Sequence, residues 1–153
     1  MKQASTITGN SAKKLVLAKI TLEIIVALLV ILLIYTGTNK LLDFEQTRFQ
    51  MGRSPFIQPI AGFTATAVPI GEILIAGLLV FKQSRMLGLF ASFFLMLLFT
   101  GYIYAMLHYS YYVPCSCGGV LAVLSWEDHL IFNIVFILIA LAGILLQQKL
   151  KSN

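Results

Sequence analysis

The chain has 153 residues, of which 59% are hydrophobic and 11% are charged, and its formal net charge at pH 7 is +5. This apolar content exceeds what the core of a water-soluble domain of this length can bury, so the composition excludes an ordinary soluble domain and predicts a membrane protein. The basic residues separate apolar segments and form no patch with interleaved aromatic residues, which argues against nucleic-acid binding and indicates a role in membrane topology.

The chain begins with a polar segment followed by an apolar one. Residues 1–14 contain several lysines, and we expect them to form a cytoplasmic N-terminal tail. The first membrane span is predicted over residues 15–37, because about 20 apolar residues cross roughly 30 Å of hydrocarbon. Within it, Lys19 and Glu23 stand four residues apart on one helix face, where they can form an ion pair near the interface. No cleavable signal peptide is evident, so this span is expected to remain as an anchor.

Residues 38–59 are predicted to form the first outer loop, which is long enough to need structure of its own. Phe44, Arg48 and Phe49 would separate apolar from charged groups on a short helix. We expect this helix to lie along the membrane surface. Pro55 and Pro59 would end any helix there.

The second span is predicted over residues 60–81 and contains Pro69 and Glu72. Glu72 falls near the middle of this span, where an ionisable group is costly unless it is protonated, paired or hydrated. Glu72 is therefore a candidate functional acid. The alternative is a neutral carboxylic acid that only donates a hydrogen bond to a neighbouring helix.

A tight turn then leads to the third span, predicted over residues 86–108, and to a second outer loop over residues 109–126. Five of the six tyrosines gather around His108: Tyr102, Tyr104, Tyr109, Tyr111 and Tyr112. Such a cluster is typical of an aromatic belt at a membrane surface, and it can also line a site.

The fourth span is predicted over residues 127–146, because Ser125-Trp126-Glu127-Asp128 has the spacing of an N-capping box. His129 and Asn133 lie one turn apart early in this span and can face the bundle. Residues 149–153 form the C-terminal tail. The predicted fold is therefore all-α, a four-transmembrane-helix bundle over residues 15–148.

The distribution of basic residues predicts the orientation of this bundle. Four spans place both termini on one side, and that side also holds the short turn. It carries eight of the eleven basic residues: Lys2, Lys13, Lys14, Lys19, Lys82, Arg85, Lys149 and Lys151. The positive-inside rule therefore predicts cytoplasmic termini, and a loop over residues 109–126 on the periplasmic side of a bacterial inner membrane.

Both cysteines of the chain, Cys115 and Cys117, lie in this outer loop, within the segment Pro-Cys-Ser-Cys-Gly-Gly. A disulfide between residues two apart closes a small strained ring that is easily reduced, which favours a redox pair. His108 and His129 could supply a proton or positive charge to it. Two alternatives remain: inert or stapled thiols, and a zinc or cuprous-copper site formed by these cysteines and histidines.

Three stretches of the chain stand out by their order and spacing: residues 35–44 (YTGTNKLLDF), residues 69–74 (PIGEIL) and residues 115–119 (CSCGG). Together they resemble the MauE/DoxX group of small four-helix bacterial membrane proteins associated with redox processes. The resemblance implies thiol and disulfide handling outside the cytoplasmic membrane, with a thioredoxin-like partner in the MauE branch and thiosulfate:quinone oxidoreduction in the DoxX branch. By position, Cys115 and Cys117 carry over as the redox pair and Glu72 as an intramembrane acid.

Three hypotheses on function follow. The first is a component of a thiol-disulfide or thiol:quinone oxidoreductase, in which Cys115 and Cys117 exchange electrons with a Cys-containing partner, and a quinone binds near Tyr104, His108 and His129. The second is a non-catalytic scaffold or accessory subunit for the assembly or maturation of a secreted protein or a larger membrane complex. The third is transport of a proton or small solute past Glu72.

Overall fold

The structure of the protein is a computed structural model that describes residues 2–110 and 125–152, with side chains described from residue 12 onward. This part of the chain is helical and contains no strand. Its elements are α1 (Lys2–Leu42), α2 (Phe44–Arg53), the 3-10 helix η1 (Gln58–Ile60), α3 (Ala61–Val80), α4 (Arg85–Tyr109) and α5 (Trp126–Lys151). Among these, α1, α3, α4 and α5 are long and apolar enough to cross a membrane, which confirms the predicted four-helix membrane fold.

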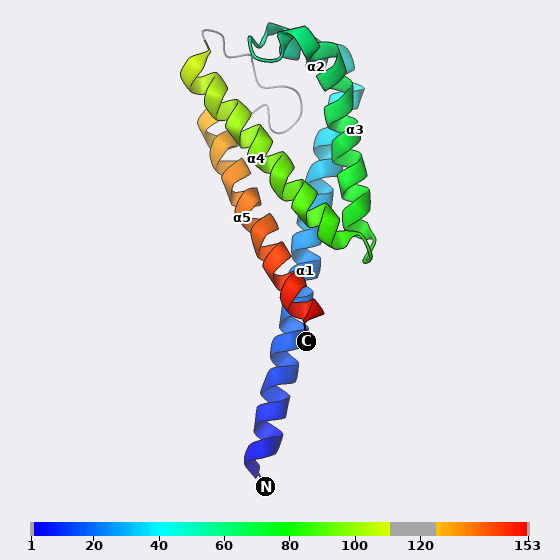
Figure 1. The fold of residues 1–153 in the computed structure, drawn as a ribbon, viewed down its shortest axis with the longest axis vertical. Coiled ribbons are helices and arrows are strands. Elements are labelled where there is room, and N and C mark those ends of the chain that lie inside the picture. Colours follow the sequence, from blue (N-terminus) through cyan, green and yellow to red (C-terminus); the bar gives the residue numbers. More distant parts are fainter. Residues whose placement is uncertain (1, 111–124, 153) are drawn as a thin grey trace.

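The two ends of the bundle differ in what they carry (Figure 1). The C-terminus and the turn between α3 and α4 lie at one end, and α1 extends beyond that end to the N-terminus. The opposite end holds α2, the end of α4 and the beginning of α5. Both termini therefore leave the bundle on the side of the α3–α4 turn. The side that faces the cytoplasm stays a prediction.

Helix α1 is longer than the span predicted from the sequence. It has 41 residues, or roughly 60 Å at about 1.5 Å per residue, about twice the hydrocarbon thickness. The polar residues that we assigned to a tail are helical from Lys2 onward, because this segment contains no proline and a single glycine, Gly9. Its apolar, membrane-spanning part is Ala12–Leu42.

At its other end α1 continues past Gly37, where we expected the span to stop, to Leu42. Gly37 lies where α1 crosses α3. A Cβ atom added at Gly37 would stand 3.1 Å from the Pro69 carbonyl oxygen and 3.1 Å from Ile73 Cγ1. The missing side chain thus permits a close helix crossing and does not end the helix. As a result, the last turn of α1 lies beside α3.

Helix α2 confirms the short helix predicted in the first connection. Thr47 and Gln50 are buried beneath it, whereas Phe49 is exposed. Just after α2, Ser54 is fully buried, and its hydroxyl accepts a hydrogen bond of 2.7 Å from the Tyr102 hydroxyl of α4. This bond fixes α2 over the end of the bundle.

The apolar core forms between the four long helices, where α1 packs against α3 and α5, and α4 packs against the same two helices. Its most buried members include Leu22, Leu29, Leu33, Leu79, Leu89, Met96, Ala140 and Ile144. Many other large apolar side chains point outward, for example Leu98 and Ile131. In water so much exposed apolar surface would drive aggregation. In a bilayer it is the surface that contacts lipid.

An ion pair joins α1 to α4 near the α3–α4 turn. Arg85 Nη1 donates to Glu23 Oε1 at 2.7 Å, and Nη2 donates to Oε2 at 3.3 Å. Arg85 Nε also donates to the Leu79 carbonyl at 3.3 Å. Among the described residues this pair replaces the predicted Lys19–Glu23 pair, because the planar guanidinium can hold both carboxylate oxygens at once.

The turn between α3 and α4 is tight because Gly88 lies against the end of α3. A Cβ atom added at Gly88 would stand 2.8 Å from the Leu79 nitrogen and 3.0 Å from the Leu78 carbonyl carbon. Both neighbours are backbone atoms, so they cannot move aside without displacing the helix. Gly101 on the same helix has open space at the corresponding position.

We expect Gly88→Ala to lower the free energy of unfolding by about 1–3 kcal/mol, the usual cost of overpacking. The matched change Gly101→Ala should be neutral or stabilise the protein by up to about 1 kcal/mol, since alanine favours helix. Unfolding of the purified proteins in detergent measures both values. Equal stability of the two variants would contradict the close crossing at Gly88.

Candidate functional site

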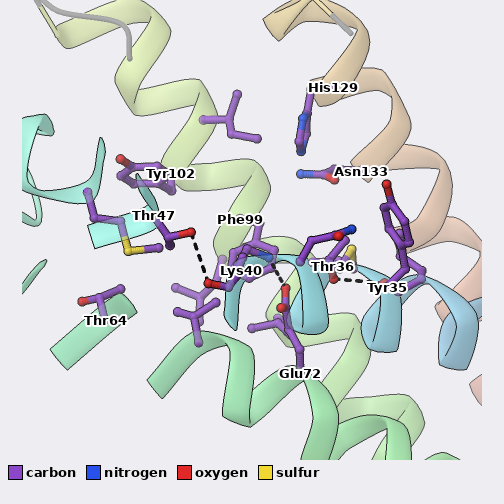
Figure 2. Close-up of a pocket in the computed structure, with 18 of the residues that line it drawn as sticks. Tyr35, Thr36, Lys40, Thr47, Thr64, Glu72, Phe99, Tyr102, His129 and Asn133 are labelled. Atoms are coloured by element: carbon purple, nitrogen blue, oxygen red, sulfur yellow. Dashed lines mark hydrogen bonds and ion pairs between the residues drawn. The ribbon is translucent and has the colours of Figure 1, made fainter. Parts of the chain in front are cut away.

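A cavity of about 380 Å³ lies between the long helices at the end of the bundle that α2 covers. All five α-helices contribute side chains to its wall (Figure 2). Most of the wall is apolar, and polar side chains enter it at separate points. Its volume is within the range of small-molecule sites, about 300–1,000 Å³.

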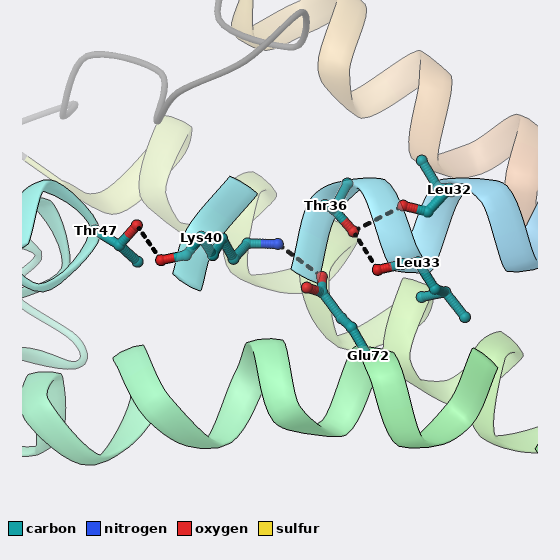
Figure 3. A network of polar contacts seen from close by, with 6 residues as sticks. All are labelled: Leu32, Leu33, Thr36, Lys40, Thr47 and Glu72. Atoms are coloured by element: carbon teal, nitrogen blue, oxygen red, sulfur yellow. Dashed lines mark hydrogen bonds and ion pairs between the residues drawn. The ribbon is translucent and has the colours of Figure 1, made fainter. Parts of the chain in front are cut away.

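Lys40 of α1 and Glu72 of α3 form an ion pair at this cavity (Figure 3). Lys40 Nζ donates to Glu72 Oε1 at 2.6 Å. The Glu72 side chain is 1% exposed and the Lys40 side chain 24%. Lys40 Nζ also lies 5.5 Å from the centroid of the Phe99 ring, within reach of a cation–π interaction. The acid predicted within the membrane is therefore paired, which lowers the cost of burying its charge.

Two threonines stabilise the segment of α1 that carries Lys40. The Thr36 hydroxyl, one turn before Lys40, donates to the Leu32 carbonyl at 3.0 Å. The Thr47 hydroxyl of α2 donates to the Lys40 carbonyl at 3.4 Å. That carbonyl lies in the last turn of α1, where backbone acceptors lack partners within the helix. A side chain of α2 therefore caps the C-terminal end of α1 and holds the backbone of Lys40 in place.

Four buried polar atoms of the described residues have no hydrogen-bond partner: Asn39 Nδ2, Glu72 Oε2, His129 Nδ1 and Asn133 Nδ2. All four belong to residues that line this cavity. Buried polar atoms are normally paired, because an unpaired one costs about 1–3 kcal/mol. Their concentration at one cavity means that the described residues leave several polar groups there without a partner.

The start of α5 positions two of these residues. Ser125 Oγ accepts a bond of 3.1 Å from the Asp128 N–H and donates one of 2.6 Å to the Asp128 carboxylate. The predicted capping signal is confirmed, with the Asp128 carboxylate bonded to the serine hydroxyl. One and two turns into the helix, His129 and Asn133 both line the cavity (Figure 2). The His129 and Trp126 ring centroids are 6.1 Å apart.

The structure separates the residues that we predicted as a quinone site. Tyr104 and His108 stack on each other with ring centroids 4.2 Å apart, and both are exposed. His108 Nδ1 donates to the Tyr104 carbonyl at 3.0 Å. Neither residue lines the cavity, whereas His129 does. Glu72 and His129 are therefore the predicted site residues that the structure brings to one cavity.

Cys115 and Cys117 lie outside the described residues, as do Tyr111 and Tyr112. The described chain stops at Ser110 and resumes at Ser125. Both of these points are at the end of the bundle that holds α2 (Figure 1). The connection that carries the cysteines therefore joins the bundle at the same end as the cavity.

Sequence reasoning missed Lys40 and Asn39 as residues of the site. Both were assigned to the outer loop, because the first span was expected to end at Gly37. If the helix continues, Gly37 and Lys40 lie three residues apart on one face, and this spacing was the available signal. Nothing in the sequence showed that the helix does continue.

We expect Lys40→Met to destabilise the protein by about 3 kcal/mol, because it leaves the buried Glu72 carboxylate without its cation. The double variant Lys40→Met with Glu72→Leu should recover most of that loss, since both charges are then absent. Thermal unfolding in detergent of the wild type, both single variants and the double variant gives the coupling energy. Additive effects would show that the two charges do not interact.

Comparison with known proteins identifies the family. The family model described as "Methylamine utilisation protein MauE" matches residues 18–146. No curated protein and no solved structure matched the chain. The matched range covers Glu72, all the residues of the cavity wall named above and the Cys115–Cys117 pair. The chain therefore belongs to the MauE family of membrane proteins.

Proposed function

We propose that this MauE-family protein takes part in thiol-disulfide redox chemistry outside the bacterial cytoplasmic membrane, with Cys115 and Cys117 as the redox pair. The observation that carries the proposal is that the two cysteines of the chain stand one residue apart in the connection between α4 and α5. A disulfide between such close residues is strained and easily reduced. It would also stabilise little as a structural link, since it closes a very short loop.

The charge distribution supports an extracytoplasmic position for this pair. Most basic residues belong to the end of the bundle with the termini and the α3–α4 turn, and three belong to the end with α2: Lys40, Arg48 and Arg53. By the positive-inside rule the end with the termini faces the cytoplasm. The α4–α5 connection then faces the periplasm, a compartment where disulfides persist.

The proposed partner is a thioredoxin-like or other Cys-containing protein in the periplasm. A thiolate of the reduced partner attacks the Cys115–Cys117 disulfide and forms a mixed disulfide, which frees one cysteine of this chain. The second thiolate of the partner then attacks the mixed disulfide and frees the other cysteine. The partner leaves with a disulfide, and Cys115 and Cys117 are left as two thiols.

Three other residues support this chemistry in the proposal. His108 is exposed at the end of α4, next to the connection that carries the cysteines. His129 lines the cavity near the start of α5. Either imidazole can hold a proton or a positive charge that favours the reactive thiolate. Glu72, paired with Lys40, is the intramembrane acid of the site.

We expect the two cysteines to be oxidised in intact cells and accessible from outside the cytoplasmic membrane. A membrane-impermeant thiol reagent should label the chain only after a mild reductant is added. The variant with both Cys115→Ser and Cys117→Ser should take no label in either condition, which controls for other reactive groups.

Single variants then identify the partner. Cys115→Ser or Cys117→Ser should trap a mixed disulfide formed in the reverse direction. The one remaining thiolate can attack the disulfide of the oxidised partner, and the chain then has no second thiol to release that partner. Full labelling without reductant, with no trapped partner, would contradict the redox role and favour a non-catalytic scaffold or accessory subunit. Labelling that fails even after reduction and denaturation would contradict the orientation.

A further inference from the structure

We infer that the cavity at Lys40 and Glu72 binds a quinone, which accepts the electrons of the Cys115–Cys117 pair. This inference rests on the proposed function, because a quinone is needed only if the pair has to be reoxidised. The chain has two cysteines, and both are in one connection, so no second pair can take the electrons onward. The acceptor must therefore be another molecule.

Two of the four unpaired polar atoms of the cavity wall are hydrogen-bond donors only. The amide nitrogens of Asn39 and Asn133 can only donate, and both lack an acceptor among the described residues. Lys40 Nζ has three N–H groups and donates one bond to Glu72. When its carboxyl is ionised, Glu72 Oε2 can only accept a hydrogen bond. His129 Nδ1 can donate or accept, depending on the tautomer of the imidazole. A ligand that satisfies this wall must present acceptor oxygens, as the two carbonyl groups of a quinone do.

The charges of the described wall favour a neutral ligand. Lys40 and Glu72 neutralise each other, and Asp43 adds a further carboxylate. An anion would therefore meet excess negative charge, and a cation would meet the Lys40 ammonium. A quinone carries no net charge, so it avoids both penalties.

The rest of the wall suits a flat apolar ring. Phe99, Trp126 and Phe132 line the cavity together with leucine and methionine side chains. Aromatic and apolar side chains with a few polar groups are the usual lining of small-molecule sites. A quinone with an apolar tail also dissolves in the bilayer around the helices, so it can approach the cavity without crossing water.

The proposed step balances in electrons and protons. Oxidation of the two thiols forms one S–S bond and releases two electrons and two protons. The quinone takes up both and becomes a hydroquinone, with each ring carbonyl converted to a hydroxyl. The cavity wall contains three groups that can donate protons to the ring oxygens: Lys40, Glu72 and His129.

Trp126 provides a direct probe of this site, because it lines the cavity and is the one tryptophan of the chain. Quinones quench tryptophan fluorescence at short range. We expect ubiquinone-1, titrated into the purified full-length protein in detergent, to quench Trp126 emission saturably. The Cys115→Ser/Cys117→Ser variant should show the same dissociation constant, since all the contacts proposed for the quinone are made by the described cavity wall.

The sharpest variant is Asn133→Leu. Leucine is close to asparagine in size, and it removes a buried amide nitrogen that has no partner among the described residues. A merely structural Asn133 predicts unchanged quenching, with stability unchanged or raised because the unpaired group is gone. A quinone ligand predicts at least tenfold weaker binding at that same stability. Asn39→Leu should act in the same way and serves as the second variant.

Gln148→Leu is the matched control, since Gln148 is an exposed amide on α5 outside the cavity. Its dissociation constant should equal that of the wild type. Quenching that rises linearly without saturation, or that is equal in Asn133→Leu, Asn39→Leu and Gln148→Leu, would overturn the quinone site. If the cysteines exchange disulfides with a partner but quinone quenching does not saturate, the quinone site is wrong and the proposed redox function still stands. Cysteines that stay inert in cells contradict the proposed function, whatever the titration shows.

Discussion

The Lys40–Glu72 ion pair is the interaction on which the rest of the α2-covered half of the bundle depends. Burying a carboxylate within the membrane is costly unless a cation pairs with it. Lys40 Nζ lies 2.6 Å from Glu72 Oε1 and provides that cation. That distance requires α1 and α3 to cross closely, which Gly37 permits because it has no side chain at the contact. It also requires α1 to continue one turn beyond Gly37, and the Thr47 hydroxyl of α2 closes that turn at the Lys40 carbonyl.

The two halves of the bundle have different physical roles. Near the α3–α4 turn, leucine packing, the Glu23–Arg85 pair and the backbone contact at Gly88 hold the helices together. At the other end the helices leave a cavity, and four buried polar atoms around it have no partner among the described residues. Unpaired groups lower stability, so a chain that keeps four of them in one place gives up stability there. Such a loss is expected at a binding site and would be unusual in a purely structural bundle.

The cysteine pair and the cavity together lead to one proposed path for electrons. A periplasmic partner would deliver electrons to Cys115 and Cys117, and a quinone in the cavity would remove them. The connection that carries the cysteines joins the bundle at the end with the cavity, so both steps would take place on the same side of the membrane. This arrangement needs no cysteine at the end of the bundle that carries the termini, and the chain has its two cysteines in the α4–α5 connection instead.

The sequence by itself determined the membrane class, the four long helices, the N-cap of α5 and the presence of an acid at position 72. These features depend on local apolar content, on residue spacing and on short-range hydrogen bonds, all of which can be recognised along the chain. The partners of the charges were decided only by the tertiary structure. Glu23 pairs with Arg85 and Glu72 with Lys40, because helix crossings bring together residues that are far apart in sequence. The cavity likewise needs side chains from five helices, and its unpaired donors are evident only once those helices have packed.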